Sequence, residues 1–272
     1  MPDIKELRNH IRNIKNTQKV TNAMFLISST RLKAGKSRLQ SASVYSRQLE
    51  ELISDTAGDM GSSVFVKGNT ASGSALLVIG AEKGLNGDFG KEIFKALTDI
   101  YNGEEMTVFA LGSRLRHTLD SNKIDYDRQF DYSVKNPEFK TAQEIADFLT
   151  DRYTEGRFGS VSVVYSDVRK GIVTEKLLPL SSQGGAVKKD YEFVPSKEKI
   201  FKSLMPLYIV EKIYYYLLST YCSEHNARII AMQAANENAK TLIDELSLQY
   251  NRLRQNAITR EISEISGERK QK

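Results

Sequence analysis

The feature that most constrains this chain is a run of sixty residues, from Leu207 to Ser266, without glycine or proline. One unbroken helix over this run would be about 90 Å long, roughly three times the diameter of a small domain. Most of such a helix cannot pack against the chain's own globular body. A second stretch, Asp3 to Ala57, contains no proline and only Gly35, which allows about 80 Å of helix. The sequence therefore predicts a shaft with a long helix at each end.

Charge is distributed unevenly along the chain. The formal net charge of the 272 residues is only +5. Residues 1–50, however, carry ten basic residues against the acids Asp3, Glu6 and Glu50; the basic ones are Lys5, Arg8, Arg12, Lys15, Lys19, Arg31, Lys33, Lys36, Arg38 and Arg47. The first helix is therefore expected to be a basic rod that attracts a polyanion or an acidic protein surface. A solvated helix face would explain the same excess.

Cysteine content and hydropathy limit the cellular compartments in which the chain is expected to work. Cys222 is the single cysteine, which excludes an intramolecular disulfide and a zinc site built on a cysteine pair. The longest apolar run, Ile213 to Leu218, is far shorter than the roughly 20 residues that span a bilayer. The first residues have no apolar secretion core, and Asp3 and Glu6 argue against a transit peptide. We expect a soluble intracellular chain that can lie beside a membrane.

Both predicted helices carry an apolar seam with steps of three and four residues, which is the period of a left-handed coiled coil. The seam of the first helix contains Ile4, Leu7, Ile11, Ile14, Gln18, Thr21, Phe25, Ser28, Leu32, Gly35, Leu39, Ala42, Ser46, Leu49 and Ile53. The seam of the last helix contains Met232, Ala235, Ala239, Leu242, Leu246, Tyr250, Leu253 and Ala257. The simplest arrangement is that the two helices wind around each other antiparallel, with the middle of the chain carried at one end.

Two windows are apolar on more than one helix face, which is typical of a buried helix. They are Ala23 to Ile27 and Ile213 to Leu218, the second extended by Tyr221 and Cys222. A two-helix pair hides only one face of each helix, so the remaining apolar surface requires a further protein around it. Contact with the central domain is the alternative. It is credible for 207–222, which follows that domain directly, and weaker for 23–27.

The middle of the chain has the pattern of a mixed α/β domain. Short apolar runs predict strands at 75–79, 106–111, 160–166 and 171–178, the last two too close together for an intervening helix. Helical patterns occupy 89–100 and a segment opened by Thr141 and Glu144, read as a capping box. We therefore expect an α/β fold class, in which a small Rossmann-like mixed domain at 73–195 accompanies the long antiparallel coiled coil. The coiled coil takes 1–57 and 207–272, and the connecting segments are 58–72 and 196–206.

No catalytic, cofactor-binding or metal-binding constellation stands out. Gly84, Gly87 and Gly90 follow the first strand, where phosphate would bind, but their spacing is not G-x-G-x-x-G, and a structural turn is favoured. Gly35-Lys36-Ser37 ends like a Walker A loop but lies inside a helical heptad. The histidines are scattered, and Glu261, Glu264 and Glu268 line one helix face as carboxylates usually do on a solvated edge. We expect no cofactor and no active site.

Several motifs together resemble the gamma subunit of F-type ATP synthases, in order over essentially the whole chain. They are the opening segment 11–24, the Lys83–Gly87 turn, 177–180, 204–206, and the closing segments 223–232 and 250–262. The family signature I-T-x-E-x-x-[DE] falls on Ile258, Thr259, Glu261 and Glu264. The chain departs from the family at Asn22, Leu26 and Arg31. Its end, from Ser266 to Lys272, is charged where the family has a short apolar tail.

The resemblance implies a noncatalytic rotor. Its coiled coil would turn inside a ring of three alpha and three beta subunits, and its α/β domain would be a foot held by the epsilon subunit and the membrane c-ring. Such a subunit lies peripherally at the cytoplasmic face of a bacterial inner membrane, and the coupling ion is H⁺ or Na⁺. The contacts to the ring implied by the resemblance are Met24, Arg228, Arg254, Gln255, Thr259, Glu261 and Glu264.

Two other functions are open at this point. A basic coiled-coil protein that binds nucleic acid would explain the charge of the first helix and the sequence pI near 9.0. Against it, the basic residues are spread along the helix and no nucleic-acid-binding module is present. A nucleotide-dependent enzyme in residues 73–195 is the other alternative, and it predicts nucleotide binding by that domain.

Overall fold

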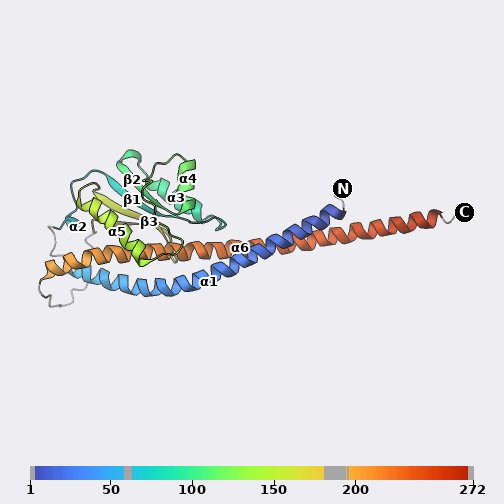
Figure 1. The fold of residues 1–272 in the computed structure, drawn as a ribbon, viewed down its shortest axis with the longest axis horizontal. Helices are drawn as coiled ribbons and strands as arrows, with labels where there is room; N and C mark the ends of the chain where they lie inside the picture. The colour runs from blue at the N-terminus through green and yellow to red at the C-terminus, as the bar shows by residue number, and fades with distance from the viewer. Residues whose placement is uncertain (1–3, 58–62, 181–193, 195, 269–272) are drawn as a thin grey trace. The chain divides into compact units, whose positions relative to one another are not determined.

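The computed structural model describes residues 4–57, 63–180, 194 and 196–268 (Figure 1). The central sheet has four strands in the order β2-β1-β3-β4. The elements along the chain are α1 (Ile4–Ala57), α2 (Val64–Lys67), β1 (Ser74–Ile79), α3 (Phe89–Ile100), the 3-10 turn η1 (Gly103–Glu105), β2 (Met106–Leu111), α4 (Ser113–Ser121), α5 (Phe139–Thr154), β3 (Ser160–Asp167), β4 (Gly171–Leu178) and α6 (Lys197–Glu268). The expected class, two long terminal helices with a small mixed α/β domain, is confirmed.

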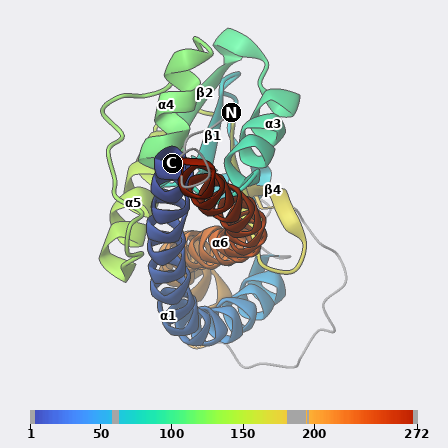
Figure 2. The ribbon, with the colours of Figure 1, turned by 90° about the vertical axis from the view of Figure 1, so that its right-hand side faces the viewer.

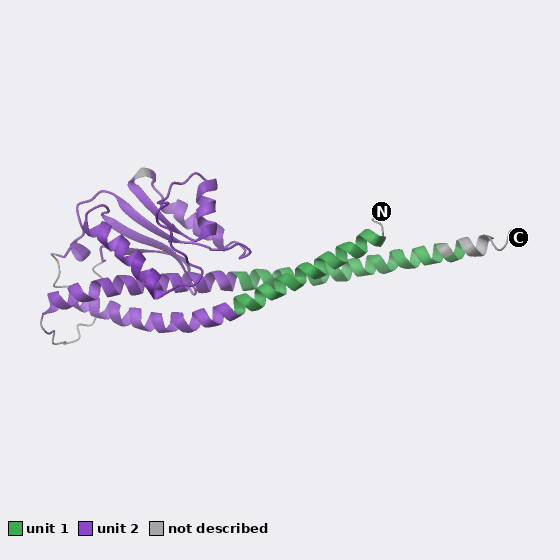
Figure 3. Ribbon diagram, in the orientation of Figure 1, with its two compact units in different colours: residues 1–29, 228–272 green, residues 30–227 purple. Residues whose placement is uncertain are grey.

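The chain forms two compact units, and each long helix contributes to both (Figure 3). Unit 1 comprises residues 1–29 and 228–272, and contains the first part of α1 and the last part of α6. Unit 2 comprises residues 30–227, and contains the sheet together with the remaining parts of the two helices. These units differ in extent from the expected shaft and foot, whose boundaries stay a prediction.

The seam of α1 follows the heptad pattern along the whole helix. All predicted positions, from Ile4 to Ile53, are buried or half-buried, whereas most of the intervening residues are exposed. Gly35 lies at a close approach, because a Cβ added there would be 2.9 Å from the Cys222 Sγ atom of α6. In a helix, a glycine at such a contact removes the side chain that would hold the two backbones apart.

The seam of α6 differs from the predicted one at one position. Leu242 is exposed, and the neighbouring Ile243 is half-buried in its place. The other predicted residues of this seam are buried or half-buried. The extra step of four residues therefore falls between Ala239 and Ile243, earlier than the sequence pattern suggested. Two aliphatic neighbours offer equally good patterns, and only the partner helix selects between them.

Helix α6 also begins earlier than expected, at Lys197, and continues through Pro206. Proline inside a helix removes a backbone hydrogen bond and is usually unfavourable. Here Phe201 and Met205, which precede it, are completely buried in the core of unit 2. Their burial favours a helical conformation over the residues before the proline, which the local sequence rules assign to a connecting segment.

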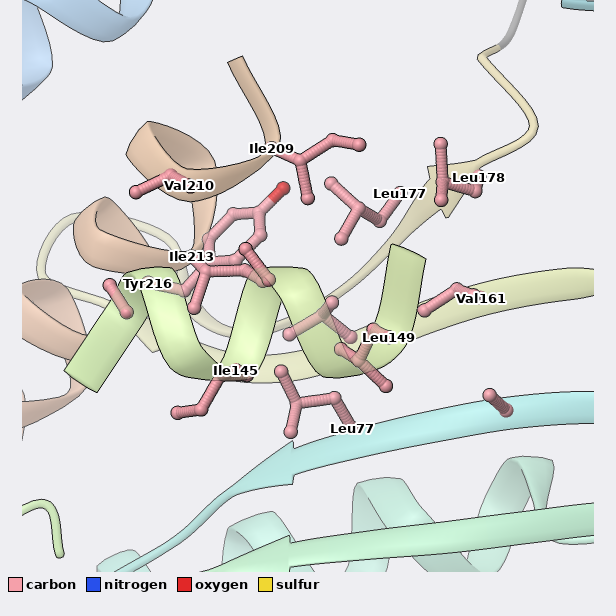
Figure 4. Packing of buried hydrophobic residues seen from close by; sticks show 14 of the residues in the cluster. Leu77, Ile145, Leu149, Val161, Leu177, Leu178, Ile209, Val210, Ile213 and Tyr216 are labelled. Carbon is pink, nitrogen blue, oxygen red and sulfur yellow. The ribbon is translucent and has the colours of Figure 1, made fainter. Parts of the chain in front are cut away.

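The sheet separates two layers of apolar side chains in unit 2. Strand β1 pairs in parallel with β2 and β3, and β3 pairs antiparallel with β4. Because side chains alternate along a strand, Leu77 of β1 joins the cluster of α5 and α6, while Leu76 and Val78 join that of α3 and α4. Figure 4 shows Leu77 with Ile145 and Leu149 of α5, and Figure 2 shows α3 and α4 gathered beside β1 and β2.

The capping box predicted from Thr141 and Glu144 is wrong. Helix α5 begins at Phe139 with Glu138 as its N-cap, and the Ala142 N–H donates to the Glu138 carbonyl at 3.1 Å. Pro137 lies directly before this cap, and a proline disfavours a helical conformation in the residue before it, so the helix is not expected to begin earlier. Thr141 is therefore already inside the helix.

Candidate subunit-binding site

In unit 1, α1 and α6 form an antiparallel pair with a defined register. Near the middle of the pair, the Thr21 Oγ1 hydroxyl donates to the Asn236 side-chain oxygen. The Gln18 side-chain amide donates to the backbone carbonyl of Asn236 at 3.5 Å. The polar residues of the predicted seam thus bind a polar partner on the facing helix, and this contact sets which residues lie level with each other.

The largely polar outer surface of this pair also carries exposed apolar side chains. Val20, Leu26 and Ile27 of α1 and Ile230 of α6 are between 54% and 59% exposed. The register places Ile27 level with Ile230. Complete burial of one such side chain contributes about 1.5–3 kcal/mol, so a partner that covered all four would gain several kcal/mol. Several large apolar side chains left in water on one helix pair favour a protein-binding site.

The two apolar windows predicted from the sequence therefore differ in burial. Ile209, Ile213, Tyr216 and Leu218 of α6 are completely buried within unit 2, which confirms contact with the α/β layers. Leu26 and Ile27 of the first window stay exposed in unit 1. The second window follows the sheet directly in the sequence, whereas the first lies in the other unit.

Beyond Leu253, α6 extends past the level of Ile4, the first described residue of α1. Arg254, Gln255 and Thr259 are exposed there, and the Thr259 hydroxyl donates only to the Gln255 carbonyl of its own helix, at 2.9 Å. Ile258 and Ile262 expose about half of their side chains between these polar residues. This end of α6 is thus a single helix whose polar and apolar groups both face solvent.

The remaining predicted contact residues are placed differently. Met24 is half-buried in the helix pair, and Arg228 is only 5% exposed. Glu261 and Glu264 belong to α6, but their side chains lie outside the described part. The structure therefore brings Arg254, Gln255 and Thr259 together on one helical segment, and it places Met24 and Arg228 elsewhere along the pair.

The edge of the sheet where a nucleotide-binding fold would receive phosphate is occupied by the chain's own carboxylates. The backbone N–H groups of Glu82 and Lys83, directly after β1, donate to the Glu224 carboxylate of α6 at 3.2 and 3.3 Å. The Glu82 carboxylate in turn accepts hydrogen bonds from the backbone N–H and the hydroxyl of Ser113, at the start of α4. These are the donors that would bind an anion. The geometry agrees with a structural role for the glycine turn at 84–90.

A second set of polar contacts fastens α6 to both of its neighbours in unit 2. The buried Lys212 ammonium binds Glu50 of α1 at 3.3 Å and Glu175 of β4 at 3.1 Å. Nearby, the Tyr215 hydroxyl donates to Asp167 at 2.9 Å, and burial together with that carboxylate raises the pKa of Tyr215 to about 12. Helix α6 is thus joined to α1 and to the sheet by one charge cluster.

Sequence reasoning missed these anchoring residues. The available signal was the pair Glu211-Lys212, directly before the apolar window that begins at Ile213, because charged residues are rarely buried without partners. Those partners, however, lie far away in the sequence. The described residues contain no group of three or more His, Cys, Asp or Glu able to hold a metal ion. Within the same part of the chain, no helix is long and apolar enough to cross a bilayer.

Comparison with known proteins decides the family. The model of a family described as ATP synthase matches residues 3–268. An ATP synthase gamma chain from Cytophaga hutchinsonii is 31% identical over 98% of both chains, and one from Pelotomaculum thermopropionicum is 33% identical over 98% of both. This chain belongs to the ATP synthase gamma chain family. Gamma chains are noncatalytic subunits of the ATP synthase complex.

Solved structures share the fold. A rotor chain of the Euglena gracilis mitochondrial ATP synthase superposes with a TM-score of 0.65 at 13% identity, covering 94% of this chain and 98% of that one. A chain of the Tetrahymena thermophila mitochondrial ATP synthase, from a structure of the central stalk and c-ring, gives a TM-score of 0.59 at 21% identity, over 79% and 99%. The two-helix and α/β arrangement is thus common to chains of very different sequence.

Proposed function

We propose that this chain is the rotor of an F-type ATP synthase and transmits torque between a membrane c-ring and a catalytic ring of three alpha and three beta subunits. The epsilon subunit is a further partner. In this role the chain performs no ATP chemistry. Its asymmetric surface presents a different face to each beta subunit as it turns, and the catalytic sites respond to that face.

The observation that carries this proposal is the exposed apolar surface of unit 1. Val20, Leu26, Ile27 and Ile230 belong to two helices that already use their seams to bind each other. A second protein around the pair would remove these side chains from water. A closed sleeve of subunits satisfies this requirement for residues on both helices at once.

The contacts that form and release in each turn are proposed to be Met24, Arg228, Arg254, Gln255, Thr259, Glu261 and Glu264. Those on the last turns of α6 are polar. Exposed ion pairs contribute about 0.2–1 kcal/mol each, which is weak enough to break during rotation. A dry apolar interface of the same area would hold one orientation too strongly.

The contacts of unit 2 support the transfer of torque into α6. Lys212 and Glu224 connect this helix to α1, to β4 and to the loop after β1. Because these bonds lie on different sides of one helix, a force on the sheet acts on α6 through several elements. We further propose that the chain lies at the cytoplasmic face of a bacterial inner membrane and reaches that membrane only through the c-ring.

Reconstitution tests the proposal directly. Alpha and beta subunits are mixed with and without this chain, and ATP hydrolysis and native mass are measured. The chain is expected to yield an active complex of 3:3:1 stoichiometry, and a mixture that never assembles would refute the proposal. The paired variant Ile27→Asp with Ile230→Asp should block assembly, whereas Val168→Asp, an exposed apolar residue between β3 and β4, serves as the matched control. The relatives give no support to the nucleic-acid alternative.

A further inference from the structure

An open pocket of about 360 Å³ lies between α1 and α6 within unit 2. It is not part of the apolar surface of unit 1 or of the sheet edge occupied by Glu224. Polar groups from both helices surround it. The lining residues are Ser37, Arg38, Ser41, Ala42, Tyr45, Glu211 and Tyr214.

The feature of this pocket that needs an explanation is Glu211. The residue is only 4% exposed, yet its carboxylate has no hydrogen-bond or ion-pair partner among the described residues. Removal of a carboxylate from water is unfavourable unless a donor or a cation replaces the lost hydration. Burial accordingly raises the pKa of Glu211. A buried acid at a pocket wall, with no partner among the described residues, is a candidate for a contact with a donor from another protein.

Two described cations, Lys212 and Arg38, are engaged with other groups. Lys212, the next residue, binds Glu50 and Glu175. Arg38, across the pocket, donates to the Tyr214 hydroxyl at 3.0 Å, to the Asn136 side chain at 3.2 Å and to the Pro137 carbonyl. Its guanidinium group is thus bound to the loop before α5, and does not form an ion pair with Glu211.

The lining groups favour an ammonium ion over a guanidinium. Ser37, Ser41 and Tyr45, which carry hydroxyl groups, line the same pocket as Glu211, its one acidic residue. An ammonium group has three donors that point in different directions, so it can bind one carboxylate and two hydroxyls together. A guanidinium is planar and binds best to a carboxylate in a two-point contact. Tyr45 of the lining is 42% exposed, and Val44, the residue before it on α1, is 48% exposed, so both are available for an apolar contact.

We propose that this pocket receives a lysine side chain of a protein partner, whose ammonium group pairs with Glu211 while an adjacent apolar residue covers Val44 and Tyr45. The inference rests on the proposed function in one respect, since the partner is sought among the subunits of the assembled complex. It goes beyond that function because it assigns a specific chemical contact to the segments of α1 and α6 that belong to unit 2.

Zero-length cross-linking tests the pairing. The assembled complex is treated with a carbodiimide, which joins a carboxylate to a lysine amine in direct contact, and is then denatured and digested with trypsin. Glu211 is the only carboxylate of the tryptic peptide 203–212, so a cross-linked mass identifies it without ambiguity. The expected product joins this peptide to a lysine peptide of another subunit. A product that joins it to a lysine of this same chain would overturn the proposal.

Two variants separate binding from folding. Glu211→Gln should weaken binding of the subunit that the cross-link identifies by about 30-fold or more. The urea midpoint of the free chain should be unchanged or higher. Glu92→Gln, an exposed carboxylate on α3, should change neither quantity. A lower urea midpoint for Glu211→Gln with unchanged binding would show an internal structural role and refute the lysine pocket.

Failure of this inference and of the proposed function are distinguishable. Assembly of the complete enzyme, with the epsilon subunit and the c-ring present, is established first from its native mass. A complex that assembles and gives no cross-link at Glu211 overturns the lysine pocket alone. A chain that enters no complex overturns both, because the inference takes its partner from that complex.

Discussion

Gly35 offers a quantitative test of how closely α1 and α6 approach each other in unit 2. A methyl group added by Gly35→Ala would meet the Cys222 Sγ atom at 2.9 Å and the Tyr221 ring at 3.1 and 3.2 Å. Alanine is better than glycine in a helix by about 0.8–1.0 kcal/mol. Excess volume in a packed contact costs about 1–3 kcal/mol. The expected net result is a destabilisation of about 1 kcal/mol.

The decisive quantity is the coupling between Gly35 and Cys222. Cys222→Ala alone removes a completely buried sulfur and leaves a void, which costs about 1 kcal/mol. In this background the alanine methyl at position 35 fills the void and no longer meets the sulfur. The double variant should therefore be more stable than the sum of the single changes predicts, by about 1–2 kcal/mol.

Urea denaturation of the full chain, followed by far-UV circular dichroism, measures all four proteins of this cycle. Gly90→Ala is the matched control, since Gly90 lies in α3 with no atom within 4 Å of an added Cβ, and it should stabilise by up to about 1 kcal/mol. If the changes at 35 and 222 add within about 0.5 kcal/mol, the close approach of the two helices is refuted.

Three further predictions concern the buried polar groups of unit 2. Lys212→Met should lower the free energy of unfolding by about 1–3 kcal/mol, because it leaves Glu175 and Glu50 without their cation. Thermal unfolding measures this change. Lys202→Met, from an exposed pair with Glu198, should change little, and equal effects of the two variants would contradict the stabilising role of the Lys212 charge cluster. Glu224→Ala should lower the free energy of unfolding by about 1–3 kcal/mol and speed hydrogen exchange at the Glu82 and Lys83 amides. Glu224→Gln should have an intermediate effect. Unchanged exchange would rule out the contact. Burial raises the pKa of Cys222 to about 11. The thiol of the unfolded chain therefore loses its proton at a lower pH, and stability should fall as the pH rises towards about 11. Cys222→Ala should remove that part of the pH dependence, and an unaltered slope would disprove it.

Much of the fold follows from local patterns. The strands Met106–Leu111 and Gly171–Leu178 begin and end where the sequence indicated, because glycine or polar residues flank short apolar runs. The seam of α1 was predictable because a 3.5-residue period recurs over the whole helix. In both cases neighbouring residues in the sequence are enough to predict the element, and no long-range contact changes its bounds or its buried face.

Long-range contacts account for the differences. The start of α6 at Lys197 depends on the burial of Phe201 and Met205 against the sheet. The choice of Ile243 over Leu242 depends on the facing helix. Of the expected contacts, the structure places Arg254, Gln255 and Thr259 together on the end of α6, while their role in binding remains a proposal.

The sequence by itself determined that two long helices frame a mixed α/β domain and that their motifs match the gamma chain family, since helix period, strand alternation and motif order are local properties. Only the tertiary structure decided how α6 is fastened to its neighbours. Lys212 binds residues from α1 and β4, and Glu224 binds the loop after β1. The physical reason is that a charge becomes buried at low cost only where distant parts of the chain supply its partners. Glu211, which has none among the described residues, marks the place where we expect another protein to supply one.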